Sequence, residues 1–87
     1  MYYTYTIYDK IDKKFYIGFT RNLQSRIKEH LRGNSNTTKK YKSLELVYYE
    51  VCVSKLDAEK RERQLKTGFG RGYLKKRIEN YLKNLGS

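Results

Sequence analysis

The chain has 87 residues, enough for one small domain over residues 1–87 with a limited core. Its 20 Lys and Arg outnumber 9 Asp and Glu, and the net charge of +11 favours nucleic acid as partner over an anionic membrane surface or a merely well-solvated surface. The sequence has neither an apolar run long enough to span a bilayer nor a secretion signal, so we expect a cytoplasmic protein with no membrane partner. Its single cysteine, Cys52, has no second cysteine with which to form an internal disulfide, so we expect a reduced protein.

The first segments predict a β-hairpin. YYTYTIY (2–8) consists of good strand formers, and FYIGF (15–19) alternates in the same way. The polar stretch DKIDKK (9–14) connects them, so we expect the two strands to pair antiparallel.

A helix is predicted next, in RNLQSRIKEHL (21–31), with Thr20 as its N-cap. Its apolar stripe consists of Leu23, Ile27 and Leu31. A polar, basic loop (33–43) leads to the strongest predicted strand, LELVYYEVCV (44–53). One face of that strand is expected to carry Val47, Tyr49, Val51 and Val53.

Two further helices are expected at the end of the chain. Ser54 and Asp57 form a plausible capping box for SKLDAEKRERQLK (54–66), and GFGRG (68–72) is interpreted as a hinge before YLKKRIENYLKNL (73–85). The core positions of the last helix are Leu74, Ile78, Tyr81 and Leu85. The order ββαβαα predicts an α+β fold, a small antiparallel sheet of about three strands flanked by helices.

Glu62 is the most informative single residue. On its helix it falls on the same side as Ala58, Leu65 and Phe69, so a carboxylate stands within an apolar stripe. Such a group needs a partner. Either it forms a buried ion pair or lies at a partly exposed edge, or it is a ligand for a hard cation such as Mg²⁺.

Arg26 and His30 lie one helical turn apart and are therefore neighbours. Read alone, the first is a solvated charge and the second a satisfied histidine on the flank of a helix. Together with a carboxylate they suit a phosphodiester site, because arginine binds phosphate and histidine carries protons. Tyr5 and Tyr16 share a face of the hairpin only if odd positions pair with even ones, and a shift of one residue would separate them. The alternative to a functional role is that both are ordinary core or edge aromatics.

The loop basics are the next candidates for binding nucleic acid. They could grip a phosphate backbone and stack on a base, or form a disordered basic loop. They are Lys39, Lys40, Tyr41 and Lys42. We also expect Arg71, in the GFGRG segment, to contact nucleic acid.

The combination of these residues resembles the GIY-YIG nuclease domain, and in particular its small stand-alone members. The resemblance rests on Tyr3-Thr4-Tyr5, Tyr16-Ile17-Gly18 eleven positions later, Thr20, Asn22-Leu23, Arg26 and His30, and it continues through TTKKYKSLELVYYE and AEKRERQLKTGFGRGYL. It implies metal-dependent hydrolysis of phosphodiester bonds in DNA, with one Mg²⁺ or Mn²⁺ ion.

Carried over by position, the resemblance implies five catalytic residues: Tyr5, Tyr16, Arg26, His30 and Glu62, the last also as the metal ligand. Gly18 is expected to be structural, letting the backbone and the substrate approach closely where the strand ends.

Two positions depart from the family pattern. Tyr3 replaces a common glycine, and Phe19 stands where some members have a lysine, whose role would pass to Arg21. The alternatives are a catalytically inactive nucleic-acid-binding module of the same fold and a basic adaptor for a protein partner. With only a nuclease core, specificity for single-stranded, duplex or branched DNA would come from its own loops, from DNA structure or from a protein partner.

Overall fold

The computed structural model describes residues 1–31 and 43–85. The elements follow the order ββαβααα, which confirms the predicted α+β fold, although the last predicted helix is divided in two. They are β1 (Tyr2–Asp9), β2 (Lys14–Thr20), α1 (Leu23–Leu31), β3 (Leu44–Cys52), α2 (Lys55–Leu65), α3 (Gly68–Arg77) and α4 (Glu79–Leu85).

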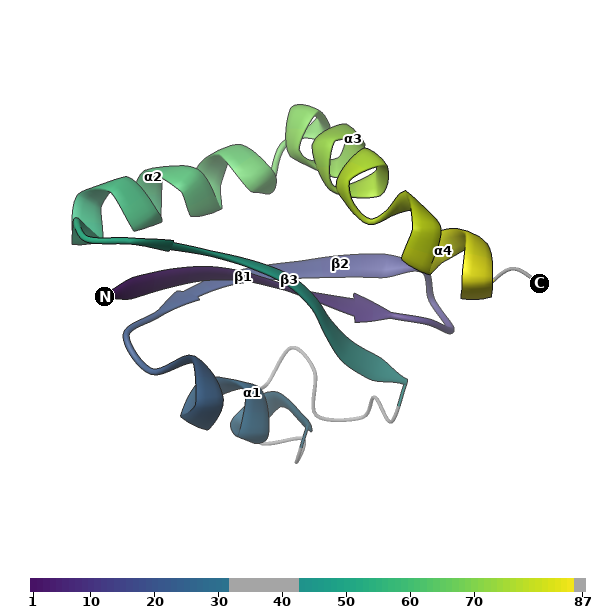
Figure 1. Ribbon diagram of the computed structural model, residues 1–87, viewed down its shortest axis with the longest axis horizontal. Helices are drawn as coiled ribbons and strands as arrows, with labels where there is room; N and C mark the ends of the chain where they lie inside the picture. Colours follow the sequence, from purple (N-terminus) through teal and green to yellow (C-terminus); the bar gives the residue numbers. More distant parts are fainter. Residues whose placement is uncertain (32–42, 86–87) are drawn as a thin grey trace.

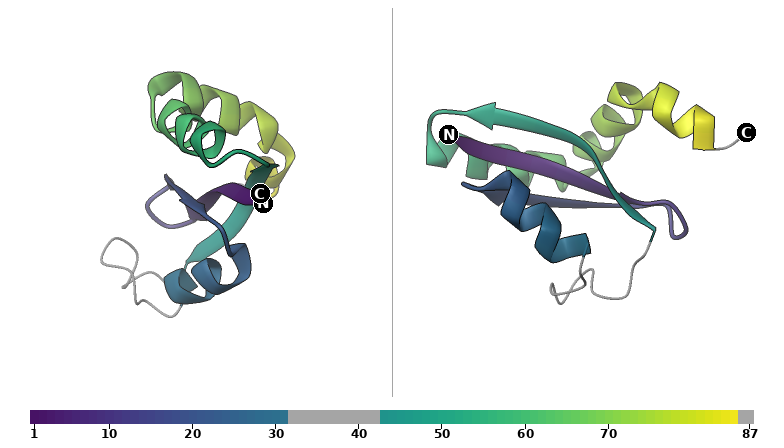
Figure 2. Two further views of the ribbon diagram at one scale, coloured as in Figure 1. Left: turned by 90° about the vertical axis from the view of Figure 1, so that its left-hand side faces the viewer. Right: turned by 60° about the horizontal axis from the view of Figure 1, so that its bottom comes forward.

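The three strands form one antiparallel sheet in the order β2-β1-β3, with β1 in the centre. Helix α1 lies on one side of this sheet, while α2, α3 and α4 lie on the other (Figure 1), and the turned views in Figure 2 show the same separation. Because side chains alternate along a strand, β1 supplies residues to both layers.

Pairing between β1 and β2 sets the faces. Tyr5 is opposite Gly18 and Ile7 is opposite Tyr16, so odd positions pair with even ones. Tyr5 and Tyr16 therefore share a face of the sheet, the one that α1 covers. On the other face, Thr4 Oγ1 donates a hydrogen bond to the carbonyl of Ala58 in α2 at 2.9 Å.

Each layer has its own apolar centre. On the α1 side, Tyr5, Ile7 and Leu44 are buried together, and the partly buried side chains packed on them are Tyr16, Leu23, Ile27 and Leu46. On the other side, the helices contribute the buried residues Ala58, Leu65, Leu74 and Ile78.

The start and the end of α1 differ from the prediction. The N-cap is Asn22, whose Oδ1 accepts a hydrogen bond from the Ser25 backbone N–H at 3.1 Å, while Thr20 Oγ1 accepts from the Asn22 N–H just before the helix. Leu31 is 52 % exposed and not part of the buried stripe. The strand thus continues to Thr20, and the helix begins at Leu23.

The predicted face of β3 is confirmed for Tyr49 and Val51, which pair with Tyr5 and Tyr3, but it is wrong for Val47 because the strand contains an irregularity. Thr6 pairs with Tyr48 but Ile7 pairs with Leu46, so one residue of β3 is passed over. Leu46, rather than Val47, therefore packs on the core beside Ile7. The strand ends at Cys52, and Val53 is 78 % exposed.

The GFGRG segment is helical and forms the first turns of α3, so its interpretation as a hinge is wrong. The break between α2 and α3 lies before this segment. Thr67 is the N-cap of α3, and its Oγ1 accepts a hydrogen bond from the Gly70 N–H at 3.3 Å. Gly70 permits a close turn, because a Cβ there would lie 2.1 Å from the Leu65 carbonyl oxygen. This break removes Phe69 from the α2 stripe and leaves it 65 % exposed. Ser54 caps α2 as expected.

Within residues 1–31 and 43–85, no helix has the length and apolar character needed to cross a membrane.

Candidate active site

A tyrosine hydroxyl of the central strand is held by two side chains of α1. Tyr5 Oη lies 2.9 Å from His30 Nε2 and accepts a hydrogen bond from Arg26 Nε at 3.2 Å. The Tyr5 and His30 rings also meet edge to face, with 5.6 Å between their centroids. Tyr5 is 2 % exposed and His30 5 %, so both side chains are almost fully buried.

Helix α1 supplies both partners because its own packing sets its rotation about its axis. Leu23 and Ile27 pack on the core around Tyr5. Positions 26 and 30 are one turn apart and lie beside that apolar pair, so both side chains meet the same strand residue. Arg26 keeps 40 % of its side-chain surface exposed, and its Nη1 also donates to Glu29 Oε2 at 2.8 Å.

Gly18 makes room for the buried tyrosine. A Cβ at this position would lie 2.2 Å from Tyr5 Oη and 2.3 Å from Cζ, far inside normal contact distance. The group that approaches the Gly18 backbone is therefore the Tyr5 ring, and a side chain at position 18 would occupy the same space.

The electrostatics of the cluster favour a neutral histidine beside a permanent cation. Burial lowers the pKa of His30 below its usual 6.5, and the charge of Arg26 lowers it further. The hydrogen bond to Tyr5 raises the pKa of Arg26, so this guanidinium stays charged. At pH 7 the imidazole is therefore neutral and one of its ring nitrogens is able to accept a proton.

All five predicted catalytic residues line one pocket of about 660 Å³ that runs along the edge strand β2. Tyr5 and Tyr16 reach it from the sheet, Arg26 and His30 from α1, and Glu62 from α2. The pocket thus extends past the β2 edge and draws on both helical layers. Tyr16 is half-buried in its wall.

Glu62 is the only acid among the described residues that line the pocket. Its side chain is 23 % exposed, and its Oε2 lies 3.1 Å from Lys66 Nζ, one turn along the helix. Glu62 thus lies at a partly exposed edge, and its ion pair is not a buried one, because the partner lysine is itself 55 % exposed.

The donor set suits one kind of metal site. Residues 1–31 and 43–85 hold no group of three or more His, Cys, Asp or Glu side chains able to enclose a metal ion. A single carboxylate does not make a closed structural zinc site. It does fit a hard cation such as Mg²⁺, which keeps several waters and takes phosphate oxygens from a substrate.

Besides Arg26, five basic side chains line the pocket: Lys13, Lys14, Lys66, Arg71 and Lys75. Only Arg71 was predicted from the sequence. Lys13 lies in the hairpin turn and Lys14 is the first residue of β2. Lys66 and Lys75 lie four residues after Glu62 and Arg71, so the i, i+4 spacing on the helices was the signal that could have identified them.

The remaining predicted nucleic-acid contacts lie elsewhere. Arg21 lines a separate hollow with Tyr3 and Tyr49, and its guanidinium carbon is 5.7 Å from the centre of the Tyr2 ring. Arg21 does not line the pocket of the five predicted catalytic residues. Lys39, Lys40, Tyr41 and Lys42 fall outside the described residues.

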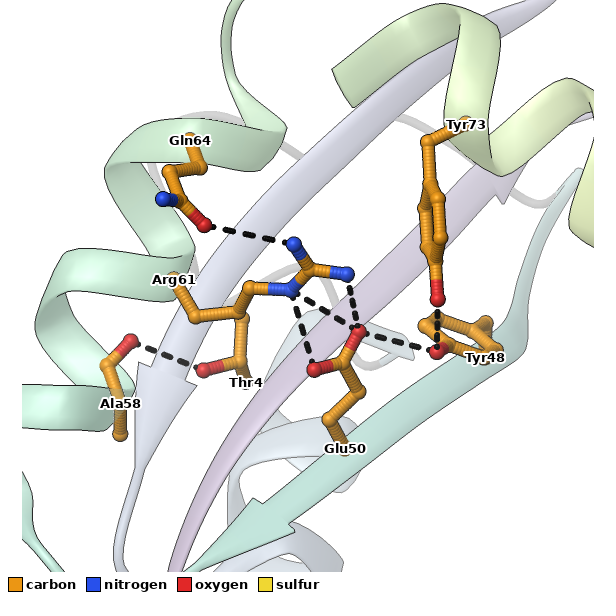
Figure 3. Close-up of polar contacts among 7 residues, drawn as sticks. All are labelled: Thr4, Tyr48, Glu50, Ala58, Arg61, Gln64 and Tyr73. Carbon is orange, nitrogen blue, oxygen red and sulfur yellow. Dashed lines mark hydrogen bonds and ion pairs between the residues drawn. The ribbon is translucent and has the colours of Figure 1, made fainter. Parts of the chain in front are cut away.

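A second polar cluster fixes α2 and α3 against the sheet (Figure 3). Arg61 Nε and Nη2 both bond the Glu50 carboxylate, at 2.9 to 3.1 Å, and Tyr48 Oη donates to the same carboxylate at 2.9 Å. Tyr48 Oη also lies 3.1 Å from Tyr73 Oη, which joins α3 to β3. Burial, followed by the hydrogen bonds with Tyr73 and Glu50, raises the pKa of Tyr48.

This cluster matters for the pocket because Glu62 directly follows Arg61. A bidentate arginine–carboxylate pair is geometrically specific. It sets the rotation of α2, and with it the direction in which the next residue leaves the helix.

Comparison with known proteins agrees with this arrangement. Residues 1–74 match the family described as the GIY-YIG catalytic domain. A UPF0213 protein of Staphylococcus haemolyticus (strain JCSC1435) is 38 % identical over 79 residues, which cover 90 % of this chain and 94 % of that protein. A UPF0213 protein of Clostridium perfringens (strain 13 / Type A) is 37 % identical over 67 residues, covering 76 % and 71 %. No solved structure matches significantly. The chain therefore belongs to the GIY-YIG catalytic domain family, whose members are generally nucleases.

Proposed function

We propose that this protein is a divalent-metal-dependent endonuclease that hydrolyses phosphodiester bonds in DNA. The observation that carries the proposal is the pocket lined by Tyr5, Tyr16, Arg26, His30 and Glu62. An acid, a permanent cation and a buried tyrosine–histidine pair are the groups that such a hydrolysis needs. Here they line one pocket, which further basic side chains also line.

Glu62 is the residue that would hold the ion, Mg²⁺ or Mn²⁺, with water and phosphate oxygens completing its shell. When bound, the ion supplies Lewis-acid polarisation of the phosphate and stabilises the leaving oxygen. Arg26 offsets the charge that builds on the phosphoryl oxygens, because two-fifths of its side chain remains exposed while Nε stays on Tyr5. Such an electrostatic contribution is commonly worth about 3–4 kcal/mol, or 10²- to 10³-fold in rate.

Tyr5 and His30 form the proton path. Arg26 Nε already donates to the Tyr5 oxygen, so the phenol proton is free to point toward His30 Nε2, 2.9 Å away. Tyr5 takes a proton from the attacking water and gives its own to the neutral imidazole. The water oxygen bonds to phosphorus, the P–O bond to the leaving group breaks, and solvent protonates the leaving oxygen. Tyr16, half-buried in the same wall, positions the phosphate.

The decisive experiment is a cleavage assay on end-labelled single-stranded, duplex and branched DNA with Mg²⁺, Mn²⁺ or EDTA. Glu62→Gln should lose cleavage by a factor of at least about 10² while retaining DNA binding. Glu59→Gln is the matched control, because it removes a carboxylate from the same helix that pairs with Lys55 and does not line the pocket. Metal-independent cutting, or cutting by Glu62→Gln at the parent rate, would refute the assignment.

One contact favours a second candidate, a binding module without catalysis. Lys66 Nζ already lies 3.1 Å from Glu62 Oε2, so a divalent ion must compete with an ammonium group for that oxygen. If Lys66 keeps its ion pair with Glu62 when the metal is present, the pocket binds phosphate through its cations but does not catalyse cleavage. The assay would then show salt-sensitive binding with no cleavage under any metal, and Lys66→Ala would restore cleavage.

A further inference from the structure

Helix α3 separates two hollows. Arg71 and Lys75 line the pocket of the proposed active site. On the other side of α3 lies a hollow of about 580 Å³, distinct from the one that Arg21 lines, and all of its lining residues come from α3: Gly68, Phe69, Gly72, Tyr73, Lys76 and Arg77. We call this second site the α3 hollow. Neither the catalytic proposal nor the core packing uses it.

The α3 hollow contains an aromatic pair that is held in place. Phe69 is 65 % exposed, and its ring stacks on Tyr73 with 6.2 Å between centroids and an interplanar angle of 25°. Tyr73 is fixed by its hydroxyl, 3.1 Å from Tyr48 Oη, and by the guanidinium of Arg61, whose carbon is 4.7 Å from the ring centre (Figure 3). The exposed ring therefore rests on a rigid support, which lowers the entropy lost when a flat ligand stacks on it.

The glycines of the hollow have no packing role. A Cβ on Gly72 would meet nothing within 4 Å, and one on Gly68 would meet only the far end of the Arg71 side chain, at 3.7 Å. This contrasts with Gly70, where the Leu65 carbonyl excludes a side chain. Neither Gly68 nor Gly72 has a positive φ, so the backbone conformation does not require glycine at these two positions. Glycine in a helix costs about 0.5–1 kcal/mol relative to alanine, and here it leaves the backbone beside Phe69 bare.

The hollow is also cationic. Lys76 and Arg77 line it, and neither forms an ion pair with any acid in the described parts of the chain. An exposed aromatic ring beside unpaired cations is the combination with which proteins bind single-stranded nucleic acid, because the ring stacks on a base and the cations contact its phosphates. An apolar protein partner would leave these charges without a counterion.

We propose that the α3 hollow binds an unpaired nucleobase of a single-stranded nucleic acid, with Phe69 stacked on the base and Lys76 and Arg77 on the flanking phosphates. The inference rests on the proposed function in that nucleic acid is the ligand. The hollow and the catalytic pocket are separated by one helix, about 10–12 Å across. One strand of a DNA duplex advances about 3.4 Å per nucleotide, so three or four nucleotides are enough to span this width even at the duplex spacing, and a single strand leaving the pocket can reach the hollow.

The chain has no tryptophan, so one can be placed in the hollow as a reporter. Phe69→Trp keeps an aromatic ring there, and stacking of a base on it quenches its fluorescence. Leu56→Trp is the matched control, since residue 56 is 73 % exposed on α2 and lines none of the described hollows. Both are titrated with single-stranded oligothymidylate and with a blunt duplex, in EDTA so that nothing is cleaved. We expect saturable quenching by the single strand at residue 69 and not at residue 56.

Two variants then test the separate contacts by fluorescence anisotropy with labelled oligothymidylate. Phe69→Leu should bind about 5- to 140-fold more weakly, the range found when a stacking ring is removed, while Phe69→Trp should bind like the parent. Lys76→Ala/Arg77→Ala should reduce the slope of log K against log salt by about 0.7 for each phosphate that is no longer neutralised. Quenching equal at residues 69 and 56, equal quenching by blunt duplex, or unchanged affinity of Phe69→Leu would overturn the proposal.

The two proposals fail separately. Quenching at residue 69 without cleavage in the metal-dependent assay would retain the α3 hollow and remove the nuclease. Cleavage that depends on Glu62, with no quenching at residue 69, would retain the nuclease and remove the α3 hollow.

Discussion

Gly18→Ala tests the packing on which the tyrosine cluster depends. The new Cβ would lie 2.2 Å from Tyr5 Oη, whereas non-bonded carbon contacts are favourable near 3.5 Å, so the ring must move by about 1.3 Å. Tyr5 is 2 % exposed and packed with Ile7 and Leu44, so the ring cannot move into solvent. Overpacking costs about 1–3 kcal/mol, and losing two hydrogen bonds at the hydroxyl costs about 0.5–1.5 kcal/mol each. The sum is about 2–6 kcal/mol.

Urea denaturation followed by far-ultraviolet circular dichroism measures this loss as a lower midpoint with an unchanged slope. Gly72→Ala is the matched control. Its Cβ meets nothing within 4 Å and the residue is helical, so it should stabilise the fold by about 0.5–1 kcal/mol. The same chemical change is therefore expected to have opposite signs at the two sites.

A double-mutant cycle identifies the cause of the Gly18→Ala effect. In a Tyr5→Leu background the atoms that clash are gone, so adding Gly18→Ala should cost at least about 1 kcal/mol less than in the parent. If Gly18→Ala alone lies within about 0.5 kcal/mol of the parent, or if its cost is the same in both backgrounds, the steric reasoning is wrong.

Three further predictions concern titration and the second polar cluster. Because burial lowers the pKa of His30 below 6.5, the unfolded chain binds a proton there that the folded chain does not, and the unfolding free energy should fall as the pH drops below 6.5. In urea titrations His30→Gln should make this fall smaller. A fall as large in His30→Gln as in the parent would contradict the prediction. Burial raises the pKa of Asp9, but the hydrogen bond from Ser43 Oγ and two backbone N–H groups outweigh it and lower the pKa below 3.8. The stabilisation by Asp9 is thus complete above pH 3.8 and is lost as the pH falls through the pKa of the folded state. Ser43→Ala should lower the unfolding free energy at pH 7 by about 1.5–3 kcal/mol, and the further decrease of the unfolding free energy at acidic pH should be smaller than in the parent. Arg61→Ala leaves Glu50 partly buried without its bidentate partner, so it should cost about 1–3 kcal/mol in the same assay, with Arg61→Lys recovering only part.

Local patterns were sufficient where one rule acted alone. Strand alternation identified the hairpin and the antiparallel sheet, and Ser54 identified the start of α2. Where two signals competed, local reasoning failed. Three glycines in GFGRG outweighed the helical signal, because the sequence does not reveal that Thr67 caps α3 or that Gly70 lies against the Leu65 carbonyl. Thr20 was a good cap by type, but Asn22 occupies that position.

For the pocket, the sequence by itself determined the residue types and the spacing within each element: a tyrosine on each of two strands, Arg26 and His30 one turn apart, and a carboxylate at Glu62. Only the tertiary structure decided whether they meet. The pairing of Tyr5 with Gly18 sets the face, because a shift of one residue would turn Tyr16 away from Tyr5. The Arg61–Glu50 pair sets the rotation of α2, and the break at Thr67 sets where the cations of α3 lie. These are contacts between residues far apart in the chain, which no local pattern encodes.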